Sequence, residues 1–162
     1  MKSTDKILIG IVAGIVLLVG ATLAIVFLRP KPTYQPEDTP QGIAHNYLLA
    51  LQQDDLERAY TYLSPSLAGY PVSLDEFSRE IRDYHWSLQN GSVTLEVEST
   101  RVPGDHATVT IRETTFYTRG ILESDQDTHY FDMQLRRENG VWKIYDSAEY
   151  WAWCWGKVGD CK

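Results

Sequence analysis

The first hydrophobic segment of the chain is an uninterrupted run. Residues 7–28 read ILIGIVAGIVLLVGATLAIVFL and carry no charged side chain. As a helix rising about 1.5 Å per residue, this run covers roughly 33 Å, enough for a hydrocarbon core of about 30 Å. It predicts one transmembrane helix after a short tail, residues 1–6, because backbone groups in lipid must be bonded internally. The alternative is a cleaved signal peptide, whose apolar region is usually shorter and ends at small residues, whereas Phe27 and Leu28 are bulky.

The next segment changes in composition. Residues 30–41 (PKPTYQPEDTPQ) hold four prolines and almost no apolar side chains. Such a composition is typical of a stiff, extended spacer. We therefore assign residues 29–38 to a linker between the membrane helix and a domain that begins at residue 39.

Three segments with the 3.6-residue period of helices follow. Thr39-Pro40 is a cap and first-turn pair, residues 54–57 start a second helix, and the capping box from Ser73 to Glu76 opens a third. The positions that this period turns inward are Ile43, Ala44, Tyr47, Leu48, Leu51, Leu56, Ala59, Tyr60, Leu63, Phe77, Ile81, Tyr84 and Leu88.

The period then becomes two, as in strands. Asn139-Gly140 predicts a tight hairpin between the last two strands. Helices followed by such a meander predict an α+β domain over residues 39–150, in which three helices pack on one face of a curved antiparallel sheet. The inward strand positions are Val93, Leu95, Val97, Ala107, Val109, Ile111, His129, Phe131, Met133, Leu135, Trp142 and Ile144.

Two stretches of this domain carry a family resemblance. TPQGIAHNYLLALQQDDLERAYTYLSP, at the first two helices, and NGVWKIYD, at the last hairpin, resemble the nuclear transport factor 2-like superfamily, the ketosteroid-isomerase cone. The resemblance implies a cone that encloses a pocket, and its membrane-anchored type is similar to bacterial envelope proteins and secretion-scaffold subunits. Because the superfamily includes isomerases, dehydratases, ligand carriers and assembly subunits, it implies no single activity.

The charge of the chain bears on which partners it can bind. The chain has 15 basic and 22 acidic residues, and four of the basic residues but only one acidic residue flank the apolar run. A domain this acidic repels phosphate backbones, so we expect no nucleic-acid binding.

The only cysteines, Cys154 and Cys161, predict a disulfide that closes the tail, residues 151–162. Because disulfides persist in oxidising compartments, they predict an extracytoplasmic domain on a single-pass cell-membrane protein. Free thiols in a cytosolic domain are the alternative, since the flanking charges do not decide the orientation.

Candidate chemistry is sparse. His129 and Asp146 lie in phase with inward strand positions, so they are candidates for a general-base pair in the cavity. Tyr84 and His85 are further cavity candidates, because dehydratases of the superfamily use such residues. For all four, a structural role at the margin of the core is the competing interpretation. The four histidines are dispersed without metal-ligand spacing, and no phosphate loop is present, so we expect no metal and no cofactor.

Two patterns suggest contact with partners. Trp151, Trp153 and Trp155 alternate and would share one face of a strand, either closing the open end of the cone or forming a partner site. A carbohydrate-stacking surface is a third interpretation. Gly10 and Gly14 form a GxxxG pair that favours packing of the membrane helix against other helices.

The sequence thus favours a membrane-anchored, extracytoplasmic accessory or scaffold subunit without enzymatic activity. Its expected partners are the lipid bilayer and other subunits of a membrane complex. The alternative is an anchored cavity protein that binds a small ligand, or an enzyme of the isomerase or dehydratase kind. A core filled with indoles would favour the first hypothesis, and buried polar groups around an open cavity would favour the second.

Overall fold

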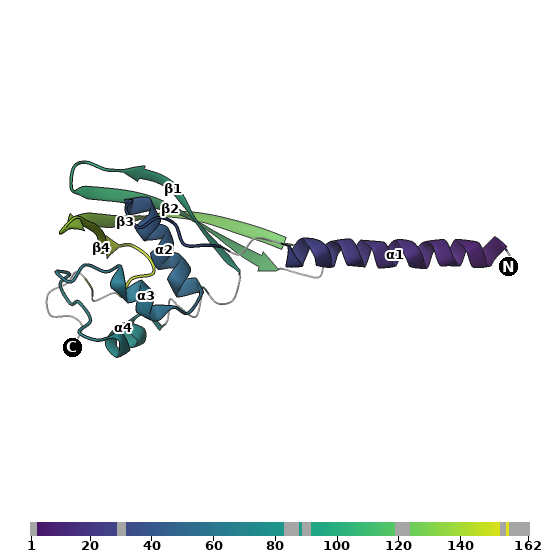
Figure 1. Ribbon diagram of the computed structural model, residues 1–162, viewed down its shortest axis with the longest axis horizontal. Coiled ribbons are helices and arrows are strands. Elements are labelled where there is room, and N and C mark those ends of the chain that lie inside the picture. The colour runs from purple at the N-terminus through teal and green to yellow at the C-terminus, as the bar shows by residue number, and fades with distance from the viewer. Residues whose placement is uncertain are drawn as a thin grey trace. The chain divides into compact units, whose positions relative to one another are not determined.

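The structure is a computed structural model of the whole chain (Figure 1). It describes residues 3–28, 32–82, 88, 92–118, 124–152 and 155, apart from the side chains of residues 3–8, 26, 27, 118 and 124. The chain forms two compact units, Met1–Pro32 and Thr33–Lys162. Residues 33–38, expected in the linker, therefore belong to the second unit.

The first unit contains one helix, α1, over Ser3–Phe27. Its described apolar side chains are exposed. Leu17, for example, has an exposed fraction of 74%, and Leu18 one of 70%. Within the part of the chain that the structure describes, no helix combines the length and the hydropathy needed to cross a membrane. The membrane-spanning role of residues 7–28 stays a prediction.

Three helices open the second unit. Those that follow Thr39 and Ser73 begin at the predicted caps, and the one between them begins within the predicted residues 54–57. Helix α2 (Pro40–Gln52) follows Thr39, whose hydroxyl accepts the Gly42 amide. Helix α3 (Leu56–Thr61) follows Asp55, whose carboxylate accepts the amide of Arg58. Helix α4 (Leu74–Glu80) begins after Ser73, which accepts the Glu76 amide at 3.2 Å, while the Glu76 carboxylate reaches back to the amide of Val72 at 2.7 Å. Side-chain acceptors thus satisfy amides that the first turn of a helix leaves unpaired.

The rest of the unit is an antiparallel sheet in the order β1-β2-β3-β4. Its strands are β1 (Val93–Arg101), β2 (His106–Thr118), β3 (Ser124–Glu138) and β4 (Val141–Ser147). Asn139 and Gly140 both have positive φ, as the predicted two-residue hairpin requires. The outer edge of β4 is partly covered by Leu63, which forms a parallel bridge with Ile144.

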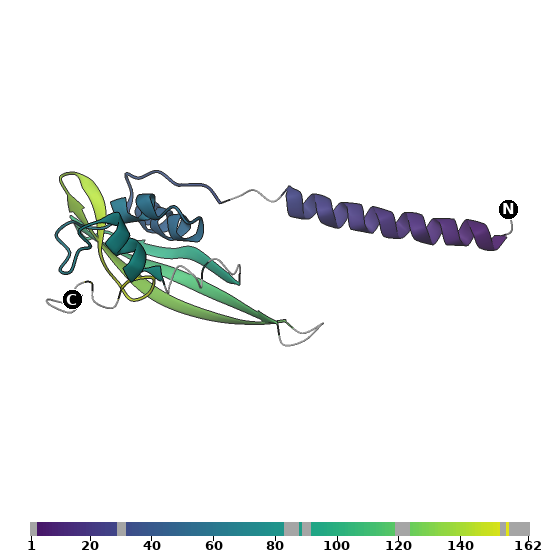
Figure 2. The ribbon, with the colours of Figure 1, turned by 90° about the horizontal axis from the view of Figure 1, so that it is seen from below.

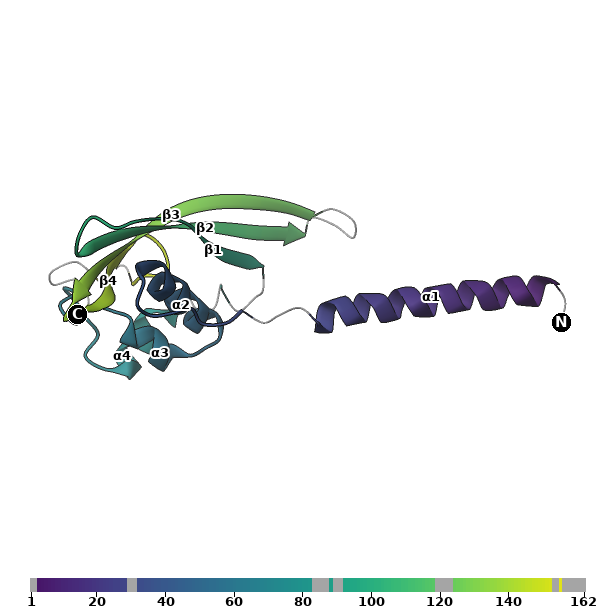
Figure 3. The same cartoon turned by 45° about the horizontal axis from the view of Figure 1, so that its top comes forward.

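The helices lie on one side of the sheet (Figure 3), so the core forms between the two layers. Strands β2 and β3 continue beyond the helices (Figures 2 and 3). The α+β class is confirmed, and this arrangement fits a cone. Most predicted inward positions are buried, among them Ile43, Tyr47, Leu63, Phe77, Ile81, Ile111, Met133, Leu135 and Ile144.

Candidate functional site

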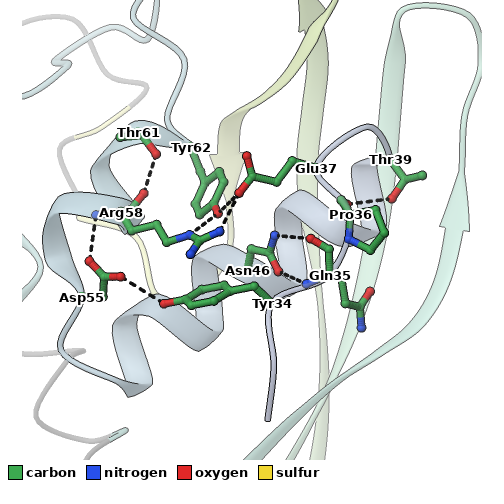
Figure 4. A network of polar contacts seen from close by, with 10 residues as sticks. All are labelled: Tyr34, Gln35, Pro36, Glu37, Thr39, Asn46, Asp55, Arg58, Thr61 and Tyr62. Carbon is green, nitrogen blue, oxygen red and sulfur yellow. Dashed lines mark hydrogen bonds and ion pairs between the residues drawn. The ribbon is translucent and has the colours of Figure 1, made fainter.

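A short segment ahead of α2 is fixed to the helices (Figure 4). We call residues 33–38 the clasp. The carboxamide of Asn46, fully buried in α2, accepts the Gln35 amide at 2.7 Å and donates to the Gln35 carbonyl at 2.9 Å. The predicted spacer is therefore shorter than its composition indicates, because this part of it folds with the domain.

Arg58 on α3 holds the other end of the clasp (Figure 4). Its guanidinium lies 3.5 Å from the ring centroid of Tyr34 and donates to Glu37 and to the Tyr62 hydroxyl, each at 2.8 Å. Tyr62 also donates to Glu37 at 2.7 Å. Hydrogen bonds from Tyr62 and then from Arg58 hold the pKa of Glu37 below its usual value. These contacts bind the chain to itself, so the clasp is structural.

The candidate binding site is a groove of about 420 Å³ at the end of the core. Strands β3 and β4 and the loop after α3 form its walls. One wall is apolar and the other polar. The groove is lined by Ser66, Leu67, Ala68, Arg136, Tyr145, Asp146 and Trp155. It brings together Asp146 and Trp155, which the sequence suggested for different roles.

The polar wall is organised by Glu138 and Arg136. Glu138 accepts from the hydroxyls of Ser64 at 2.6 Å and Ser66 at 3.0 Å, and from the Arg136 guanidinium at 2.7 Å. Burial raises the pKa of Glu138, but the hydrogen bonds from Ser64, Arg136 and Ser66 outweigh it, so the pKa lies below its usual value. Arg136 also lies 5.4 Å from the ring of Tyr145. This wall therefore presents groups that are already paired.

The two described tryptophans of the tail belong to the core. Trp155 is stacked on Phe77 at 5.6 Å and donates its indole N–H to Glu80 at 2.6 Å. Trp151 meets Trp155 edge-on at 4.9 Å, and both are buried. The expected strand is not present at these two positions, because Trp155 lies in a turn closed by its amide and the Ala152 carbonyl. Trp153 lies outside the described residues.

The proposed His129–Asp146 pair is not formed. A β-bulge puts Tyr145 between the partners of Gln134 and Leu135, so that Ser147 turns inward and Asp146 is exposed. His129 is in phase with the core but is exposed, on a part of β3 that pairs with β2 and not with β4. About five residues of β3, roughly 16 Å, separate His129 from the position opposite Asp146.

Several other candidates are not tested by these contacts. Tyr84, His85, Cys154 and Cys161 lie outside the described residues. Gly10 and Gly14 face open space, since an added Cβ at either would meet no atom within 4 Å. Among the described residues, no group of three or more acidic, histidine or cysteine side chains could hold a metal ion.

Most buried polar groups of the described core are bonded inside the domain, whereas the indole N–H of Trp142 is buried without a hydrogen-bond partner. Asn46, Ser64 and Ser147 are the buried polar or charged residues of the described core, and each hydrogen-bonds within the chain. The phenol of Tyr47 donates to the Tyr150 carbonyl at 2.7 Å, and burial raises its pKa. Burial and then the charge of Glu113 raise the pKa of Tyr150. Both phenols are therefore neutral at pH 7.

Sequence reasoning missed Asn46, Arg58, Ser64 and Arg136. An asparagine among the apolar residues of α2 was the one signal in the sequence that a buried polar contact is present. The partners of the other three are far away in the chain, and no local pattern identifies them.

No protein-family model and no curated protein matches the chain. Three solved structures illustrate what it is similar to. One is a nuclear transport factor 2-like protein with a cystatin-like fold from Novosphingobium aromaticivorans, at 14% identity and a TM-score of 0.48, covering 80% of this chain and 84% of that one. Another is a protein containing a SEC-C motif from Rhodopseudomonas palustris. It shares 14% identity with a TM-score of 0.48, and the match covers 71% of this chain and 81% of that one.

A third is a nuclear transport factor 2-like protein of unknown function from Shewanella oneidensis. It shares 15% identity with a TM-score of 0.44, and the match covers 65% of this chain and 90% of that one. At this level the likeness does not assign a family or an activity, so the function is argued from the chain's own residues.

Proposed function

We propose that this chain is a membrane-tethered accessory subunit whose outer domain binds a partner protein. The described core carries the proposal. Trp151 and Trp155 pack into it, and the buried side chains of Asn46, Ser64 and Ser147 are bonded to the domain itself. A cavity enzyme needs an acid or base within reach of its substrate, whereas the buried phenol of Tyr47 is engaged with the Tyr150 carbonyl.

The tether is supported by the first unit. Residues 7–28 carry no charge, and α1 exposes large apolar side chains such as Leu17 and Leu18. A continuous apolar surface of this kind is covered by lipid or by another protein. The extracytoplasmic orientation depends on the predicted bond between Cys154 and Cys161.

The groove beside Trp155 is the part of the outer domain that suits a protein partner. Its lining combines apolar Leu67 and Ala68 with Arg136 and Tyr145. Arginine and aromatic side chains are enriched in protein interfaces, where an apolar centre is surrounded by polar groups. Because Arg136 is already paired with Glu138, it can contact a neutral surface without leaving a buried charge unpaired.

The proposal is tested by site-specific photo-crosslinking in native membranes. A photoreactive amino acid replaces Ala68, in the groove, and in a control chain it replaces Glu57, on the exposed side of α3. We expect a discrete protein adduct from position 68 and none from position 57. The proposal fails if neither position yields an adduct while the membrane-extracted chain carries a small molecule.

A further inference from the structure

Strand β3 is longer than the strand beside it. Its pairing with β4 begins at Met133, opposite Ser147. The amide of Ala148 still donates to the Asp132 carbonyl at 3.3 Å, and the chain then turns away at Tyr150, where φ is +55°. Between Ser124 and Asp132, β3 is paired with β2 on one side, and no described strand lies on the other.

The direction of the backbone groups follows from this contact. Because the Asp132 carbonyl points toward the β4 side, the two-residue alternation turns the amide and carbonyl of Tyr130 and Thr128 to that side too. No described residue bonds to these four backbone groups. The same alternation includes Gln126, whose amide donates to the Asp125 carboxylate at 2.9 Å. The open edge therefore consists of the backbone groups of Thr128 and Tyr130, on the part of β3 that β4 does not reach.

A cavity of about 600 Å³ lies along this edge. Its lining consists of Thr110 from β2, His129 and Phe131 from one face of β3, Tyr130 and Asp132 from the other, and Ala148 just after β4. The lining therefore combines both faces of β3 with the residue at which β4 stops, next to the open edge. Its position suits an added strand.

The charges near the edge define what such a strand would carry. Asp125 and Asp127 lie on β3, and Glu113 is the β2 partner of His129. Carboxylates beside a strand repel an acidic neighbouring segment, because like charges on paired strands are destabilising. A segment with alternating lysine or arginine side chains meets carboxylates instead.

We propose that the open edge of β3, at Thr128 and Tyr130, receives an extended basic segment of a partner protein as an additional β-strand. The inference rests on the proposed function and specifies how a partner is recognised. Backbone hydrogen bonds from Thr128 and Tyr130 supply the pairing, and the surrounding carboxylates select a basic sequence.

The test measures binding of a labelled peptide, acetyl-TKVKVKT-amide, to the full chain in detergent micelles by fluorescence anisotropy. The matched acidic peptide, acetyl-TEVEVET-amide, is the control for charge. Thr128→Pro removes the edge amide, and Thr128→Val keeps it. Proline is tolerated at a strand edge where its nitrogen faces away from the ladder, so thermal unfolding is expected to show that both variants are folded.

We expect the basic peptide to bind, the acidic peptide to bind at least about tenfold more weakly, and Thr128→Pro to lose about tenfold in affinity. Thr128→Val should bind as the unmodified chain does. A second variant, Asp125→Asn with Asp127→Asn, leaves the backbone intact and should reduce the preference for the basic peptide.

Hydrogen exchange completes the test. In the free chain the amides of Thr128 and Tyr130 should exchange fast, and the peptide should protect them. Protection in the free chain, equal binding of both peptides, or unchanged affinity in Thr128→Pro would each overturn the strand-addition site. A protein adduct at Ala68 that persists alongside such a result would leave the proposed function standing and remove only this edge.

Discussion

The side chain of Asn46 and the backbone of Gln35 exchange two hydrogen bonds, with donor–acceptor distances of 2.7 and 2.9 Å. Asn46 is fully buried, and losing its carboxamide removes the protein partner of both the amide and the carbonyl of Gln35. We predict that Asn46→Ala lowers the free energy of unfolding by about 2–3 kcal/mol. Chemical denaturation of the full chain measures this change. Gln41→Ala, at an exposed position of the same helix, should change it by less than about 0.5 kcal/mol.

A second prediction concerns the room between α2 and the clasp. A Cβ added to Gly42 would lie 1.9 Å from the Pro36 carbonyl oxygen. Replacing a helical glycine by alanine usually stabilises by up to about 1 kcal/mol, but here the clasp must move. We predict that Gly42→Ala destabilises the domain by about 1–3 kcal/mol. The sign of the change in the midpoint of thermal unfolding tests this prediction. An unchanged or raised midpoint would mean that the clasp does not contact α2 as described.

The clasp also marks a limit of sequence reasoning. The caps at Thr39 and Ser73 and the hairpin at Asn139-Gly140 are local patterns, and the structure confirms them. By composition residues 33–38 resemble a spacer, because the groups that bind them, Asn46 and Arg58, are placed by helix packing. A pattern of prolines contains no information about an acceptor on another element.

A third prediction uses pH. The hydrogen bonds to Glu37 lower its pKa below the usual 4.5, so its stabilising contribution is present above that value and is lost as the pH falls through the lowered pKa. Glu37 is half exposed, and its contribution at pH 7 is therefore less than about 1 kcal/mol.

The measurement is denaturation of Glu37→Gln and of the unmodified chain at pH 7 and at pH 3. The difference between the two chains should be largest at pH 7 and shrink in acid. Glu57→Gln, at an exposed position of α3, controls for the loss of one negative charge. A difference that grows in acid would contradict the assigned contacts.

A fourth prediction separates the two interactions of Trp155. Trp155→Ala removes the stacking on Phe77 and the bond to Glu80, and should cost about 3–5 kcal/mol. Trp155→Phe keeps an aromatic ring on Phe77 and should cost about 1.5–3 kcal/mol, the range for a hydrogen bond to a charged group. Near-ultraviolet circular dichroism and denaturation report both changes. Equal, small effects would place the indole outside the core.

Strand irregularity explains why the candidate pair His129 and Asp146 could not be judged from the sequence. Alternation assigns both to the inward face, but the bulge at Tyr145 reverses the phase before Asp146. His129 keeps its phase but lies on the part of β3 that β4 does not reach. Alternation predicts the face of a strand, whereas burial depends on what covers that face.

The central claim is that the outer domain binds a protein. Native mass spectrometry of the full chain, extracted from membranes in mild detergent, tests it most directly. The claim predicts a second polypeptide in fixed stoichiometry with the chain. It also predicts dissociation of that polypeptide in Ala68→Arg, which places a long side chain in the groove, and retention in Glu57→Arg. A chain that is released alone and carries a small-molecule adduct would contradict it.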